Sequence, residues 1–233
     1  MIVVYSDEVP ELDDFLRNRL GQKHRITVIP PSPTEMGAAK HATEHFRHVG
    51  LRARTQNTRF YRDPHRLHNI IMNSDAVYLI GGNTFDFLDY AHHIGLFELL
   101  DEFEQAGGII IGDSAGSIIL SPNIATALIP TTCPDDHTVD MESYLGMGRI
   151  PFHISPHFDP SAEVAQHELD ELQTLANVSN RAVMVLQDGE GFIMEGNDIV
   201  QTTGKPKRLE PDASIPAVVN AVEILPIWAS IVE

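Results

Sequence analysis

The sequence predicts an α/β fold in which a mostly parallel sheet carries helices on both faces. Short β-branched runs alternate with stretches whose apolar residues recur at helical spacing. Each apolar run stops at glycine or proline, as at Pro30-Pro31 and Gly81-Gly82. Regular alternation of strands and helices is typical of parallel sheets, because each parallel connection crosses one face of the sheet through a helix.

The individual elements follow from these patterns in chain order. Strands are expected at residues 2–5, 26–29, 51–55, 76–80, 108–111, 151–155, 182–186, 191–194, 199–202 and 217–225. Helices are expected at residues 10–20, 34–49 with Thr34 as the cap, 64–72, from 83 or 84 onward, 96–105, from 115 onward and 161–176. Residues 121–140 are rich in Pro, Thr and Asp, which predicts a long surface loop.

Composition limits the classes of partner. The 233 residues show no repeat or linker and are expected to form one domain over residues 1–233. Lys and Arg total 16 against 33 Asp and Glu, a formal charge of −17, which disfavours nucleic acid and anionic membranes. The single cysteine, Cys133, excludes an internal disulfide framework and favours a reducing compartment. Without a signal peptide or membrane span, the expectation is a soluble cytoplasmic protein.

The most informative motif is Gly-Asp-Ser-Ala-Gly at residues 112–116, between an apolar strand and a helical run. A serine at such a tight turn is lifted out of the sheet, and the small flanking residues permit the strained backbone. A helix N-terminus there would stabilise a developing oxyanion. The motif alone is equally compatible with a turn that only caps a helix.

A second glycine turn supports the catalytic interpretation. Residues 76–80 end in Gly81-Gly82-Asn83, again at the carboxyl end of an expected parallel strand, where sites of open α/β sheets gather. Turns on neighbouring strands would bring the Gly82 amide near Ser114, and with the Ala115 amide it would form a pair of oxyanion donors. Asn83 is both a candidate substrate-binding residue and a plausible helix N-cap.

A serine nucleophile needs a base, and His157 is the best candidate among twelve histidines. It follows a strand within Ser155-Pro156-His157-Phe158, where Pro156 fixes the backbone. His153, inside the strand, is a poorer choice. His41, His45 and His48 share a helix face, but no accompanying carboxylate motif supports a metal site, and none is expected.

The order of the residues separates two types of hydrolase. An α/β-hydrolase carries its nucleophile, then the acid, then a late histidine. The last histidine in this chain is His167, so no histidine is available in the final strands. The base must therefore follow Ser114 as His157, with the acid between them or after His157.

Three segments together resemble peptidase family S51, which contains peptidase E and the cyanophycinases: residues 81–84, 112–117 and 155–158. The likeness extends over about residues 2–191 and implies the sheet of class I glutamine amidotransferases, with serine in place of the cysteine nucleophile. It implies Ser114 as nucleophile, His157 as base and the Gly82 and Ala115 amides as oxyanion donors.

The resemblance leaves two positions for the acid. A Leu-x-Glu/Asp-Gly turn of the family is matched by Leu186-Gln187-Asp188-Gly189, and a different assignment places the acid in the loop at Asp135 or Asp136. We favour Asp188, because a carboxylate at a strand end is better fixed than one in a long loop. Asp188 could also be a simple hairpin residue.

The expected function is hydrolysis of small peptides by a serine peptidase of dipeptidase or aminopeptidase type, without metal or cofactor. The alternatives are a cyanophycinase-like hydrolase, an esterase and a catalytically silent binding module. Members specific for N-terminal aspartate resemble one another in an arginine-rich helix after the histidine, whereas residues 165–172 here contain no arginine and three acids. A substrate other than an N-terminal aspartyl peptide is therefore expected, unless Arg149 or Arg181 reaches the site. A homo-oligomer is compatible with the sequence.

Overall fold

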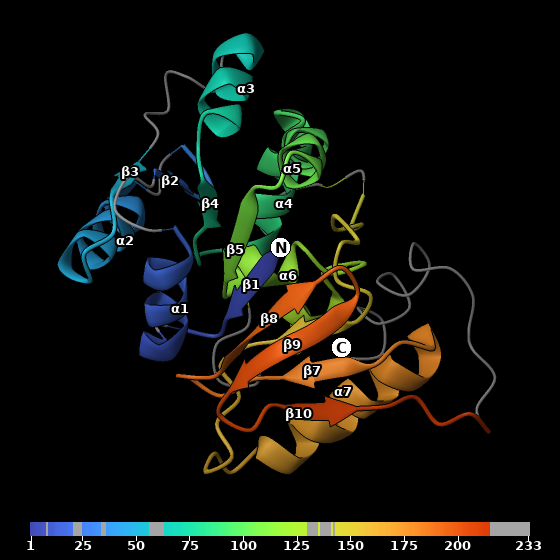
Figure 1. Cartoon of the computed structure of the whole chain (residues 1–233). Coiled ribbons are helices and arrows are strands. Elements are labelled where there is room, and N and C mark those ends of the chain that lie inside the picture. Colours follow the sequence, from blue (N-terminus) through green and yellow to red (C-terminus); the bar gives the residue numbers. More distant parts are fainter. Residues whose placement is uncertain are drawn as a thin grey trace.

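The structure, a computed structural model, describes residues 1–7, 9–20, 25–33, 36–55, 63–129, 135, 141 and 143–214. Its main sheet has seven strands in the order β3-β2-β4-β5-β1-β8-β9 (Figure 1). Five neighbouring strands are parallel: β3 (Ala53–Thr55), β2 (Ile26–Ile29), β4 (Ala76–Leu79), β5 (Ile109–Asp113) and β1 (Ile2–Tyr5). The antiparallel strands β8 (Gly191–Glu195) and β9 (Asp198–Thr203) extend this sheet beyond β1.

Helices cover both faces of the parallel strands, as the sequence predicts. On one face lie α1 (Pro10–Leu20) and α2 (Met36–His48), whose Leu16 and Phe46 belong to the same core cluster as Val3 and Tyr5 of β1. The other face packs Ile2 and Val4 with α3 (Pro64–Met72), α4 (Thr84–His93), α5 (Leu96–Gln105) and α6 (Ala115–Ile118). Because both faces are covered, β1, β2 and β4 are buried at every position, and apart from Thr27 of β2 their sequences are apolar.

A second, three-stranded sheet lies beside the main one, in the order β10-β7-β6. Strands β6 (His153–Ser155) and β7 (Val183–Val185) are parallel, and β10 (Lys207–Leu209) pairs antiparallel with β7. Helix α7 (Ala165–Ser179) lies next to this sheet (Figure 1). Its leucines at positions 172 and 175 are buried. The α7 connection between β6 and β7 is the usual one for a parallel pair.

The predicted elements are largely confirmed, with shifted ends and one change of sheet. The strands expected at 151–155 and 182–186 belong to the small sheet, and β10 was not predicted. The strand at 108–111 runs to Asp113, and the helix at 161–176 becomes Ala165–Ser179. The 121–140 segment contains a 3₁₀ turn, η2 (Ala125–Leu128). Thr34 and the strand expected at 217–225 lie outside the described residues.

The two sheets bring their strand ends to one place. The carboxyl ends of β1, β4 and β5 meet at one edge of the main sheet, because these strands are parallel neighbours. The ends of β6 and β7 are also parallel neighbours, and residues 186–190 connect β7 to β8 of the main sheet. Residues just past these five strand ends are therefore candidates for a shared site. No helix within the described ranges is long and apolar enough to span a bilayer.

Candidate active site

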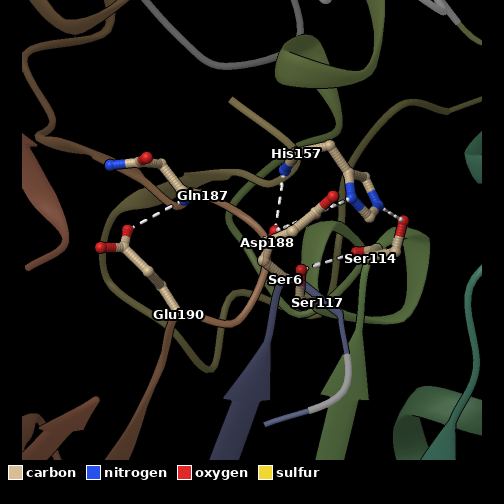
Figure 2. Close-up of polar contacts among 7 residues, drawn as sticks. All are labelled: Ser6, Ser114, Ser117, His157, Gln187, Asp188 and Glu190. Carbon is tan, nitrogen blue, oxygen red and sulfur yellow. Dashed lines mark hydrogen bonds and ion pairs between the residues drawn. The ribbon is translucent and has the colours of Figure 1, made fainter. Parts of the chain in front are cut away.

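Ser114 lies on a strained turn between β5 and α6. Its φ and ψ are 50° and −117°, a conformation that L-residues seldom adopt. Glycine is required on either side: a Cβ on Gly116 would lie 2.0 Å from the Leu79 carbonyl oxygen, and one on Gly112 would lie 2.7 Å from the Gly116 carbonyl oxygen. The Ser117 hydroxyl donates to the Ser114 carbonyl at 2.6 Å, which further fixes the turn (Figure 2).

The helix after Ser114 is shorter than the sequence suggested. Helix α6 has only four residues, so the helix dipole expected to support an oxyanion is small. The amides of Ala115 and Gly82 remain as donors, and within the described chain neither makes a hydrogen bond. Gly82 has φ +142° and packs against Pro31, where a Cβ would lie 2.6 Å from the proline Cγ. Its neighbour Gly81 lies close to Ser114, so that an added Cβ there would lie 3.1 Å from the serine Cβ.

His157 connects Ser114 to a carboxylate. Its Nε2 lies 2.7 Å from Ser114 Oγ, and its Nδ1 lies 2.6 Å from Asp188 Oδ1 (Figure 2). Since the carboxylate accepts from Nδ1–H, Nε2 is left to accept the serine proton. The His157 and Asp188 side chains are 45% and 64% exposed, so the site is open to solvent.

The Ser6 hydroxyl, just past the end of β1, links the backbone of the histidine to the carboxylate. It accepts the His157 backbone N–H at 2.8 Å and donates to Asp188 Oδ1 at 3.5 Å (Figure 2). Ser6 is fully buried. The backbone of His157, which it holds, has a positive φ of 60°. One side chain of the main sheet thus holds the backbone of the histidine and the carboxylate beside it.

The turn that carries Asp188 is itself anchored by Glu190. One carboxylate oxygen of Glu190 accepts the Gln187 amide at 2.9 Å, and the other accepts the Lys205 amide at 2.7 Å. The Glu190 carbonyl accepts the Ser6 amide at 3.1 Å. Glu190 is 7% exposed and packs against Gly204, where a Cβ would lie 2.6 Å from its Cγ. These hydrogen bonds of Glu190 fix residues 187–190 to both sheets.

Asp113 is a second carboxylate next to the nucleophile. Burial, assisted by the negative charge of Asp7, raises its pKa from 3.8 to about 7. The Tyr78 hydroxyl, the charge of His157 and the Gly81 amide act in the opposite direction and offset part of this effect. Such a perturbed group beside a strained serine is characteristic of functional sites.

A protein-family model matches most of this chain. The model of peptidase family S51 matches residues 4–202, which include Ser114, His157 and Asp188. The chain belongs to peptidase family S51.

Two individual relatives show how similar the sequences are. An uncharacterized peptidase of Listeria monocytogenes is 28% identical over 132 residues, which cover 56% of this S51 chain and 61% of the relative. A peptidase E of Streptomyces coelicolor is 29% identical over 140 residues, covering 58% and 55% respectively. The chain therefore aligns with less than two thirds of the length of these two relatives. A crystal structure of a candidate peptidase E protein from Listeria monocytogenes matches with a TM-score of 0.68 at 23% identity, covering 90% of this chain and 98% of that one, which shows the fold.

Most of the predicted site residues of this S51 chain lie together. Ser114, His157 and Asp188 are in hydrogen-bond contact, and the Gly81-Gly82 turn lies against the serine. Asn83 is the N-cap of α4, where its Oδ1 accepts the Asp86 amide at 3.0 Å, so the capping interpretation is confirmed. A contact of Asn83 with substrate stays a prediction.

The alternative acids are placed differently. Asp135 Oδ2 accepts the Thr84 amide at 2.8 Å instead of bonding to His157. Asp136 lies outside the described residues. His153 is fully buried in β6, where burial and the charge of Arg181 lower its pKa to about 4. The described residues hold no cluster suited to a metal ion, and His45 pairs with Asp13 at 2.9 Å.

Sequence reasoning missed Ser6, Glu190 and Asp113. Ser6 follows a predicted parallel strand, so the rule that sites gather at carboxyl ends would have singled it out. Asp113 was visible as the residue before the nucleophile, but its burial depends on tertiary packing. Nothing local distinguishes Glu190, whose partner at Lys205 is distant in the sequence.

Proposed function

We propose that this chain is a serine peptidase that hydrolyses small peptides through an acyl-enzyme. The observation that carries the proposal is the continuous hydrogen-bonded path from Ser114 Oγ through the His157 imidazole to Asp188, at 2.7 and 2.6 Å. Membership of a peptidase family supports the peptide as the substrate class. The site residues need no metal or organic cofactor for this reaction.

The first half-reaction forms the acyl-enzyme. His157 Nε2 takes the Ser114 proton as Oγ attacks the scissile carbonyl carbon, and the Gly82 and Ala115 amides donate to the oxyanion. The resulting imidazolium is stabilised by the Asp188 carboxylate, which remains ionised. The imidazolium then protonates the leaving amine as the carbon–nitrogen bond breaks.

The second half-reaction reverses these roles. The first product leaves, and His157 Nε2 removes a proton from a water molecule that attacks the ester carbonyl. The same two amides bind the second oxyanion, and the imidazolium returns its proton to Ser114 Oγ as the acid product forms. The exposed faces of His157 and Asp188 leave this water a direct route from solvent.

Labelling with a fluorophosphonate probe tests the nucleophile, because the probe reacts with activated serine hydroxyls. Mass spectrometry should place the label on Ser114 alone. Ser114→Ala should abolish both labelling and peptide turnover, with a loss in kcat of about 10³- to 10⁶-fold. Ser161→Ala, at an exposed serine outside the site, is the matched control and should keep both. Wild-type turnover in Ser114→Ala would refute the serine mechanism.

A substrate panel tests the substrate class. Dipeptides and tripeptides should be cleaved with kcat/KM well above that of simple alkyl esters, and a polymer carrying arginine side chains tests the cyanophycinase-like alternative. Preference for the esters would favour an esterase. Labelling of Ser114 without any turnover would favour a binding module.

A further inference from the structure

Asp113 connects the turn of the nucleophile to the turn of the proposed oxyanion donor. It directly precedes Ser114, and its carboxylate accepts hydrogen bonds from the Tyr78 hydroxyl and the Gly81 amide. The register of the β4–β5 pair explains the bond from the tyrosine. Ile111 lies opposite Tyr78, and Asp113 is two residues farther along β5, so the two polar side chains are diagonal neighbours on one face of the sheet.

The Gly81-Gly82 turn needs contacts of this kind. Glycine loses more backbone freedom on folding than any other residue, whereas oxyanion donors act from a fixed position. Gly82 packs against Pro31, where a Cβ would lie 2.6 Å from the proline Cγ. Beside Gly81, the Asp113 Oδ2 atom lies 3.6 Å from the point that a Cβ would occupy. Pro31 therefore restricts the second glycine, and Asp113 restricts the first.

Burial of this carboxylate costs folding stability. Asp113 Oδ1 is buried and has no hydrogen-bond partner among the described residues. Burial, assisted by the charge of Asp7, raises the pKa of Asp113 from 3.8 to about 7. The stability of the folded state is therefore complete below pH 3.8 and decreases as the pH rises toward 7. Since asparagine would avoid this cost at neutral pH, the carboxylate is better explained by the site than by folding.

We propose that Asp113 is a positioning residue, which holds the Gly82 amide at the oxyanion by binding the neighbouring Gly81 amide. This inference rests on the proposed function, because it needs Ser114 as the nucleophile and the Gly82 amide as a donor. Asp113 itself contacts neither the substrate nor the reacting atoms. An ionised carboxylate accepts stronger hydrogen bonds than a neutral group, so it fixes the turn best when it is charged.

Asp113→Asn tests the assignment, because it keeps the shape and one acceptor oxygen but removes the charge. At pH 8.5 we expect kcat to fall about 10- to 100-fold with KM nearly unchanged, since the oxyanion exists only in the transition state. A peptide aldehyde adds to Ser114 Oγ and places its oxygen on the same donors. Its inhibition constant should therefore rise by the factor by which kcat/KM falls. Unchanged kcat and unchanged aldehyde inhibition would overturn the proposal.

The pH dependence distinguishes positioning from a structural role. The titratable groups that face Asp113 are Tyr5 of β1, Asp7 after β1, Tyr78 of β4 and His157 after β6. Both proteins need a neutral His157, so the ratio of kcat/KM between wild type and Asp113→Asn reports Asp113. This ratio should be near one at pH 5.5, where Asp113 is protonated, and should reach about 10 to 100 at pH 8.5. A constant ratio over this range would contradict the proposal.

Folding stability should change in the opposite direction. Asp113→Asn removes the cost of burying a charge, so its urea midpoint at pH 8.5 should be at least as high as that of the wild type. Glu104→Gln is the matched control, because Glu104 lies at the opposite end of β1, 3.3 Å from the Met1 nitrogen and 2.5 Å from Arg149. It should lower the urea midpoint and leave kcat unchanged. A joint loss of stability and kcat in Asp113→Asn would make Asp113 structural.

Tyr78→Phe is a second variant, which keeps the buried ring and removes only the hydroxyl. Without this donor the protonated form of Asp113 is favoured, so the rise of kcat/KM with pH should move to higher pH. Tyr90→Phe, which removes a hydroxyl from a buried tyrosine of α4, is the matched control and should keep the wild-type profile. A wild-type profile in Tyr78→Phe would count against the ionised carboxylate as the acting group, and so against the proposal.

The outcomes separate this inference from the proposed function. A wild type that carries the fluorophosphonate label on Ser114 and cleaves peptides, with Asp113→Asn equally active at pH 8.5, overturns the Asp113 assignment alone. A wild type that neither labels nor cleaves overturns the proposed function and this inference with it.

Discussion

Replacement of Glu190 tests whether the turn that carries Asp188 must be held rigidly. The Glu190 carboxylate accepts hydrogen bonds from the amides of Gln187 and Lys205, and the Glu190 side chain is buried. Hydrogen bonds to a charged group each contribute about 1.5–3 kcal/mol to stability. Glu190→Gln keeps one acceptor oxygen but turns an NH₂ group toward the other amide. The expected loss in the free energy of unfolding is therefore that of one bond, about 1.5–3 kcal/mol, measured by urea denaturation.

The same substitution should lower kcat and leave KM nearly unchanged, because Asp188 orients His157 and makes no proposed contact with the substrate. Complete loss of the orienting acid costs about 10⁴-fold in kcat in serine proteases, and a shift of about 1 Å in a positioning group can cost 10²-fold. We expect Glu190→Gln to lose about 10- to 100-fold in kcat. The rate of fluorophosphonate labelling should fall in parallel, since it reports the activation of Ser114 without peptide binding.

Glu195→Gln, at an exposed carboxylate on β8, is the matched control and should change neither quantity. A variant at position 190 that loses stability but keeps the wild-type kcat would mean that Glu190 only stabilises the fold. Unchanged stability and unchanged kcat would refute the claim that the Glu190 hydrogen bonds hold the turn.

Three further predictions follow from the hydrogen bonds and burial around the site. Ser6→Ala removes the acceptor for the His157 amide and the donor to Asp188, and should lower kcat by about tenfold, measured with the same peptides. Asp188→Asn should reduce kcat by about 10³- to 10⁴-fold, whereas Asp135→Asn, whose amide oxygen can still accept from Thr84, should change it less than threefold; the reverse ranking would make Asp135 the acid. The folded state favours neutral His153, whose pKa is lowered to about 4, so the stability it contributes is complete above its unfolded pKa of about 6.5 and is lost as the pH falls toward 4. Urea denaturation at pH 7 and pH 4.5 should show a smaller loss of stability for His153→Leu than for the wild type.

The sequence was sufficient for the main sheet because its strands are short apolar runs closed by glycine or proline. Residues 26–29 and 64–72, for example, form β2 and α3 with the predicted bounds. The separation of the strands at 153–155 and 183–185 into a second sheet could not be predicted, because their apolar pattern is the same in either sheet. β10 could not be predicted because it has three residues, of which Lys207 and Arg208 are exposed and charged and only Leu209 is buried.

The candidate site also contains residues that the sequence predicts and residues that it does not. Ser114 and His157 stand out locally, in a glycine-flanked turn and after a strand, and Asp188 required the additional comparison of two candidate turns. The supporting groups could not be predicted, because their partners are distant in the chain. Ser6 meets the His157 amide across 151 residues, and Glu190 meets Lys205 across 15.

The turns that follow β6 and β7 of the small sheet supply the base and the acid of the candidate site. The β6–β7 ladder continues past the strand ends, with the Leu186 amide bonded to the Ser155 carbonyl and the Phe158 amide bonded to the Leu186 carbonyl, both at 2.9 Å. Beyond these bonds the two extensions turn, with a positive φ at His157 and at Gly189, and His157 Nδ1 comes within 2.6 Å of Asp188 Oδ1. The base and the acid thus come from one parallel pair and the serine from another sheet, so the site forms only when Ser6 and the 186–190 turn join the two.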